Sequence, residues 1–170
     1  MTNLANKTEP KSDFSEFSLD DYPLYNLNRT SATYANEMSA ALQTIGMDQT
    51  QWRILGILGD KNNSTVSEIA RRGVIKISTV TRMLERMERD NLLMREPWAK
   101  DKRIVRVSLT PEGHVALNAA LAIWANIHSA ATQGISQPDM TIFIDTLKKI
   151  RENLGRNRYS QKPRDENLHV

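Results

Sequence analysis

Cationic and hydroxyl-bearing side chains gather in one short stretch of the sequence. Ser78 and Thr79 open a segment in which Arg82 and Arg86 recur four residues apart, on one face of a helix. Arginine can donate two hydrogen bonds to a guanine edge, and hydroxyls at a helix start can reach phosphate oxygens. A second polar cluster follows, comprising Lys100, Asp101, Lys102 and Arg103. These residue types indicate nucleic-acid binding rather than bond-making chemistry.

The charge of the chain is concentrated in the same region. The 170-residue chain has a net charge of only +3, yet residues 61–110 contain 12 Lys and Arg against 6 Asp and Glu. Residues 1–60 contain 4 against 8, and residues 111–170 contain 7 against 6. A basic segment within a near-neutral chain is typical of a phosphate-binding face, although an ordinary solvated surface would have the same composition.

The sequence lacks the residues that several classes of function require. The chain has no cysteine, which excludes disulfides, thiolate catalysis and cysteine-ligated zinc. The three histidines, His114, His128 and His169, stand in no metal-ligand or catalytic motif, and no phosphate-binding glycine pattern occurs. We therefore expect no enzyme, no catalytic residue, no metal site and no cofactor; metal sensing through scattered histidines is a weak alternative.

The expected location follows from the distribution of apolar residues. No run approaches the roughly 18 apolar residues of a membrane-spanning helix, and the polar N-terminus lacks the apolar segment of a signal peptide. We expect a cytoplasmic protein that does not bind membranes.

Helix signals recur along the first half of the chain. The spacing of apolar residues predicts a long helix over Leu24–Ile45, with Gly46 as its stop. Asp48 with Gln51, and Thr65 with Glu68, have the spacing of capping boxes and predict two further helix starts. A fourth helix is expected from near Ser78. Its inward face would consist of Val80, Met83, Leu84 and Met87.

The periodicity changes after this helix. Leu92–Glu96 and Ile104–Leu109 predict a β-hairpin whose long basic tip covers residues 97–103. Asp101 is expected to clamp the guanidinium of Arg103 and fix its direction. Trp98 would pack on the base of the strands, which we favour, or contact DNA.

Two more helices are predicted beyond the hairpin. Thr110-Pro111-Glu112 has the pattern of a helix start, and Ser136 with Asp139 caps a last helix that ends at Gly155. Residues 1–20 are expected to be a disordered N-terminal tail and residues 156–170 a polar C-terminal tail.

These elements predict a mainly α fold with a small β-hairpin wing, in which a helix-turn-helix reads the major groove of duplex DNA. The alternative for each arginine is an ordinary solvated position or an ion pair within the helix, as Glu85–Arg89 and Arg86–Asp90 would form. The expected DNA contacts are Thr65, Lys76, Ser78, Thr79, Thr81, Arg82, Arg86, Lys100, Asp101, Lys102 and Arg103.

The sequence resembles the MarR family of winged-helix transcriptional regulators. The resemblance rests on residues 47–55, 67–70, 78–88 and 101–113, and it spans about residues 22–154. It implies a lobe at residues 47–109 and a helical dimerisation region at residues 21–46 and 110–155. It further implies a homodimer on a pseudo-palindromic operator, most often a repressor. In such regulators a small molecule, often an aromatic acid, releases the protein from DNA.

Five residues are candidates for an effector site. Aromatic and cationic groups that would suit an aromatic carboxylate are Tyr25, Arg29, Tyr34, Trp52 and Arg53, although all five would also be ordinary core and surface residues. A winged helix that binds protein instead of DNA is the remaining alternative, and a steep salt dependence of DNA binding would distinguish the two.

Overall fold

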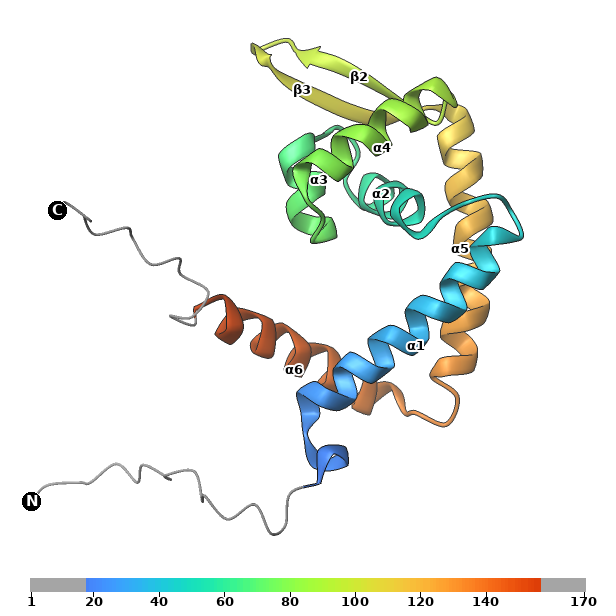
Figure 1. Ribbon diagram of the computed structural model, residues 1–170, viewed down its shortest axis with the longest axis vertical. Helices are drawn as coiled ribbons and strands as arrows, with labels where there is room; N and C mark the ends of the chain where they lie inside the picture. Colours follow the sequence, from blue (N-terminus) through green and yellow to red (C-terminus); the bar gives the residue numbers. More distant parts are fainter. Residues whose placement is uncertain (1–17, 157–170) are drawn as a thin grey trace, which may run out of the picture. The chain divides into compact units, whose positions relative to one another are not determined.

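A computed structural model describes residues 18–156 (Figure 1). The chain divides into two compact units, with the boundary after Ile127. The predicted N-terminal tail, residues 1–20, lies outside the described residues up to residue 17. It is wrong for Leu19 and Asp20, which belong to a 3-10 helix, η2, Leu19–Asp21. Residues 157–170 of the predicted C-terminal tail also lie outside the described part.

The first two long helices begin and end where local signals place them. Helix α1, Pro23–Gln43, ends in a left-handed turn at Gly46, where the amide of Met47 donates to the carbonyl of Leu42. Helix α2, Gln49–Asp60, starts with the predicted capping box. Asp48 accepts from the Gln51 amide, and the Gln51 side chain accepts from the Asp48 amide.

The helix-turn-helix consists of α3, Val66–Gly73, and α4, Ile77–Arg89. The capping box of Thr65 and Glu68 is confirmed at the start of α3. The turn after α3 has an unusual backbone conformation. Val74, not a glycine, has the left-handed backbone conformation, with φ 52° and ψ 45°. A β-branched residue in this region is a genuine outlier.

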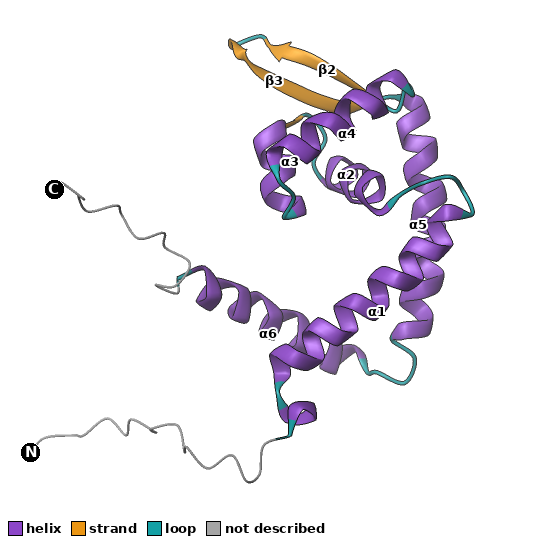
Figure 2. Ribbon diagram, in the orientation of Figure 1, coloured by secondary structure: helices purple, strands orange, loops and turns teal. Residues whose placement is uncertain are grey.

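The hairpin differs from the predicted one in its tip and in a third strand. Strands β2, Leu93–Trp98, and β3, Asp101–Leu109, leave only residues 99 and 100 as the turn, so the long tip predicted at residues 97–103 is wrong. A short strand β1, Ser64–Thr65, pairs antiparallel with β3, and the sheet order is β1-β3-β2. Figure 2 shows the hairpin of β2 and β3 alongside α4. The fold class is as predicted: mainly α with a wing.

A single apolar core holds the first unit together. Its fully buried members come from α1, α2, α3, α4, β2, β3 and α5: Met38, Leu42, Ile54, Leu55, Leu58, Ile69, Val80, Leu84, Met87, Leu93, Val107 and Ala120. Because the inward faces of α3 and α4 share this core with the strands, the helix-turn-helix and the wing are held as one body.

Two helices follow the wing. Helix α5, Pro111–Ala131, approaches the turn between α4 and β2 so closely at Gly113 that a Cβ there would lie 1.9 Å from the carbonyl oxygen of Leu92. Helix α6, Gln137–Gly155, lies in the second unit and starts at Ser136, which accepts from the amide of Asp139 as predicted. Among residues 18–156, no helix has both the length and the apolar character needed to cross a bilayer.

Candidate nucleic-acid interface

Helix α4 presents one apolar and one polar face. Val80, Leu84 and Met87 are buried, whereas Ser78, Thr79 and Arg82 are exposed. Arg82 forms no hydrogen bond or ion pair with any residue between 18 and 156. Its guanidinium is therefore available to a ligand outside the chain.

Arg86 is placed differently from Arg82. Its guanidinium lies 3.5 Å from the carboxylate of Asp48, the N-cap of α2, and 3.9 Å from that of Asp90. The Asp90 contact is the intrahelical ion pair that the sequence offered as an alternative. Asp48 draws Arg86 toward α2, and Asp90, the C-cap of α4, pairs with it as well. Arg86 is therefore partnered among the described residues, whereas Arg82 is not.

The other predicted DNA contacts of the helix-turn-helix also fall into two groups, side chains that are exposed and side chains that are bonded within the fold. Lys76, at the N-cap of α4, is exposed. Thr65 and Thr81 use their hydroxyls inside the fold. Thr65 accepts from the amide of Glu68, and Thr81 donates to the carbonyl of Ile77. Lys76, Ser78, Thr79 and Arg82 are thus the better placed for DNA.

The wing carries a rigid cationic pair. Arg103 donates from Nε and from its terminal guanidinium to the two oxygens of Asp101, at 3.0 and 2.9 Å, which confirms the predicted clamp. These hydrogen bonds lower the pKa of Asp101 and raise that of Arg103. The Arg103 side chain is 90% exposed, so its guanidinium is fixed in direction yet open to solvent. Lys100 and Lys102 are exposed beside it.

Trp98 stands at the tip end of β2, opposite Asp101, and its ring contacts a cation of the neighbouring strand and one of the turn rather than the base of the strands that the sequence favoured. The guanidinium of Arg106 lies 4.9 Å from the centre of the Trp98 ring, and the Lys100 ammonium lies 5.8 Å from it. Both distances permit cation–π attraction. Trp98 therefore joins the tip of the wing to the neighbouring strand.

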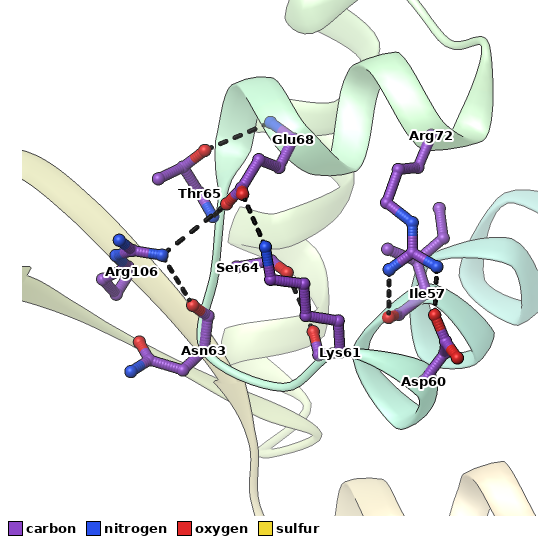
Figure 3. Close-up of polar contacts among 9 residues, drawn as sticks. All are labelled: Ile57, Asp60, Lys61, Asn63, Ser64, Thr65, Glu68, Arg72 and Arg106. Atoms are coloured by element: carbon purple, nitrogen blue, oxygen red, sulfur yellow. Dashed lines mark hydrogen bonds and ion pairs between the residues drawn. The ribbon is translucent and has the colours of Figure 1, made fainter.

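A polar network anchors the wing to α3 (Figure 3). Glu68 accepts from the Thr65 amide at 2.8 Å and from Lys61 at 2.9 Å, and Arg106 lies 3.6 Å away. Arg106 also donates to the carbonyl of Asn63 at 2.9 Å. The hydrogen bond from the Thr65 backbone, followed by that from Lys61, lowers the pKa of Glu68 to about 2. Sequence reasoning found Glu68 only as a cap, and it missed Arg106.

A second ion pair joins the wing to α4. Arg95 of β2 donates to Glu88 from Nε at 2.9 Å and from a terminal nitrogen at 2.5 Å. This contact lowers the pKa of Glu88 and raises that of Arg95. The direction of the wing relative to the helix-turn-helix is thus set by two separate anchors, Arg106 of β3 on α3 and Arg95 of β2 on α4.

A cavity of about 230 Å³ lies between α1 and α2. It brings together three of the five expected effector residues, Tyr34, Trp52 and Arg53. Tyr25 and Arg29 do not line it. The Arg29 guanidinium lies 5.5 Å from the Tyr25 ring centre and 3.3 Å from Asp20. The cavity is completed by Ser31, Ala35, Met38 and Gln49.

Comparison with known sequences places the chain in one protein family. Residues 47–105 match the sequence model of the MarR family. The chain is 29% identical over 146 residues to the HTH-type transcriptional repressor IacR of Pseudomonas putida, and the match covers 86% of each protein. It is 30% identical over 104 residues to the HTH-type transcriptional regulator YkoM of Bacillus subtilis (strain 168), covering 61% of this chain and 68% of YkoM.

Solved structures share the fold. A MarR family regulator from Silicibacter pomeroyi has a TM-score of 0.77 at 26% identity, covering 86% of this chain and 99% of that one. The M. tuberculosis regulator MOSR, solved in complex with DNA, has a TM-score of 0.61 at 29% identity, covering 79% and 98%. Bordetella bronchiseptica BpsR, whose DNA binding is regulated by 6-hydroxynicotinic acid, has a TM-score of 0.70 at 18% identity, covering 80% and 97%.

Proposed function

Because this chain belongs to the MarR family, we propose that it is a repressor that binds a pseudo-palindromic operator as a homodimer and leaves it when a small aromatic acid binds. The family itself consists of DNA-binding winged-helix transcription regulators, which are not enzymes. An operator-binding protein acts where the chromosome is, so the cytoplasm remains the expected location.

The observation that carries the proposal is the pair of open guanidinium groups on one lobe. Arg82 is unpartnered among the described residues, and Arg103 is directed by Asp101 while 90% exposed. Arg82 can read a base in the major groove, while Arg103 can enter the adjacent minor groove, where negative potential is strong. Lys76, Ser78, Thr79, Lys100 and Lys102 would supply the phosphate contacts.

The proposed homodimer accounts for apolar side chains that remain exposed on the flanking helices. Leu24 of α1 and Leu121 of α5 are exposed, as are Ile142, Phe143 and Leu154 of α6. Burying such residues against a second copy is favourable. Two lobes related by a two-fold axis would then meet half-sites about one helical turn, ~34 Å, apart.

The proposed effector is an aromatic acid in the cavity between α1 and α2. Trp52 and Tyr34 offer aromatic walls, and Arg53 offers a cation for a carboxylate. The regulation of BpsR by 6-hydroxynicotinic acid supports an effector of this class. The effector would weaken DNA binding only if it binds the DNA-free conformation more tightly.

One selection experiment tests the proposal. The full chain would be used to select duplexes from a random DNA pool, and the selected duplex would then be bound with and without aromatic acids. We expect an enriched palindromic sequence whose affinity falls steeply with salt. Arg82→Ala should lose this enrichment, whereas Arg151→Ala, which removes an exposed cation of α6, should keep it. No enrichment, or salt-insensitive binding, would reject the proposal in favour of a protein-binding module.

A further inference from the structure

Arg53 connects the cavity to the helix-turn-helix. Its side chain lines the cavity together with Tyr34 and Trp52. A terminal nitrogen of the same guanidinium donates to the carbonyl oxygen of Gly73 at 3.1 Å. Gly73 is the last residue of α3, where carbonyl groups have no partner within the helix. One cation thus serves both the cavity wall and the C-terminus of α3.

The segment that Arg53 holds is strained. Val74 follows Gly73 with φ 52° and ψ 45°, and the residue is 90% exposed. The left-handed conformation brings the Cβ of an L-residue too close to the following carbonyl. Solvent exposure removes any packing gain that would compensate, so surrounding hydrogen bonds must maintain the conformation.

Three donor groups maintain this turn. The amide of Val74 donates to the carbonyls of Ala70 and Arg71, the latter at 3.4 Å, and the amide of Ile75 donates to the carbonyl of Ala70 at 3.0 Å. The bonds from these two amides form the usual left-handed end of a helix, in which glycine normally stands where Val74 is. The third donor is the guanidinium of Arg53, which alone comes from another helix.

The turn leads directly into the DNA-reading helix. Helix α4 begins at Ile77, and its N-cap, Lys76, forms no side-chain capping bond. The placement of Ser78, Thr79 and Arg82 therefore depends on the turn that precedes them. A change at Val74 would move the N-terminus of α4, the part that a helix-turn-helix inserts into the groove.

We propose that Arg53 is a positioning residue, a latch that keeps the turn at Val74 in its DNA-reading form until a carboxylate in the cavity takes its guanidinium. A carboxylate can accept two hydrogen bonds from arginine, against one accepted by the Gly73 carbonyl, so the acid competes effectively. Release leaves the strained Val74 free to relax, which shifts the population away from the DNA-reading form. This inference rests on the proposed function, because it describes the regulation of the same DNA-binding lobe.

A mutant cycle on the full chain tests the latch. Operator affinity would be measured for the wild type, Arg53→Ala, Val74→Gly and the double variant, with the duplex obtained by selection. Arg53→Ala should bind about tenfold more weakly, the value of one charge-assisted hydrogen bond. Glycine adopts the left-handed conformation without strain. The double variant should therefore recover most of the affinity, and Arg29→Ala, an arginine of α1 outside the cavity, should bind like the wild type.

Benzoate is the probe for the carboxylate. It should weaken operator binding by the wild type, affect Val74→Gly less, and leave Arg53→Ala unchanged. Wild-type affinity in Arg53→Ala, or a loss that Val74→Gly does not restore, would overturn the latch. If Arg53→Ala does not fold, Arg53→Lys replaces it in the test. Lysine keeps the charge and one donor nitrogen, so we expect an operator affinity between those of the wild type and a protein without the latch. Wild-type affinity, or complete loss of affinity, would overturn the latch. Absence of any benzoate effect on the wild-type complex would overturn the competition. The proposed function fails separately, when the wild type selects no duplex at all.

Discussion

Replacing Glu68 by glutamine isolates the charge that anchors the wing. Glutamine at the third position of a helix can still complete a capping box with Thr65, so the bond to the Thr65 amide is retained. What the variant loses is the negative charge that faces Lys61 at 2.9 Å and Arg106 at 3.6 Å. Glu68→Gln is therefore expected to destabilise the lobe without altering its helices.

The magnitude follows from the titration of Glu68. Its pKa is lowered from 4.5 to about 2, and one pKa unit corresponds to about 1.4 kcal/mol. The ionised carboxylate therefore adds at most roughly 3.5 kcal/mol to the free energy of unfolding. The Glu68 side chain is 29% exposed and that of Lys61 57%, so water screens much of the attraction. The capping bond, which the variant keeps, also contributes to the shift. We therefore expect a loss of about 1 kcal/mol at neutral pH.

The pH dependence provides the sharper assay. Because the folded pKa of Glu68 is lowered, its stabilisation is complete above about pH 4.5 and disappears as the pH falls toward 2. Urea unfolding of both proteins, at one protein concentration, should show a free-energy difference that is largest near pH 7 and shrinks below about pH 4. Glu112→Gln, which removes an exposed carboxylate of α5, is the matched control. Equal stability at pH 7, or a difference that does not change with pH, would refute the reasoning.

Three further predictions concern the wing, the reading helix and the fold. Asp101→Ala should weaken operator binding several-fold although it removes a negative charge, because Arg103 loses its direction; tighter binding in a gel-shift titration would contradict this. Arg82→Ala should cost about tenfold or more on the selected operator and much less on random DNA, so equal losses would identify Arg82 as a phosphate contact. Gly113→Ala should lower the thermal midpoint severely, because its Cβ would meet a backbone carbonyl oxygen at 1.9 Å. Gly56→Ala, whose Cβ would meet nothing within 4 Å, should not, and similar midpoints for the two would disprove the close approach.

Features that depend on neighbouring residues could be predicted from the sequence. The capping box of Asp48 and Gln51, and the clamp of Asp101 and Arg103, involve partners no more than three residues apart. In such pairs the residue types and their spacing nearly determine the geometry. The wing was found for the same reason, since alternating residues mark a strand without knowledge of its partner.

Features that depend on distant partners could not be predicted. Arg86 bonds to Asp48, 38 residues earlier, and the two-residue strand β1 exists only because Ser64 pairs with Val107. Arg53 lines the cavity and Arg29 does not. This difference depends on how α1 and α2 pack against each other, and the spacing of apolar residues does not reveal that packing. The left-handed Val74 contradicts its own local preference and is maintained by its surroundings.

Protection of guanine N7 against methylation, on the selected duplex, tests the central claim most directly. The account predicts two protected patches in the major groove, about one helical turn or ~34 Å apart, each lost in Arg82→Ala. A single patch, or protection that persists without Arg82, would contradict the claim that two copies of the lobe read DNA through α4.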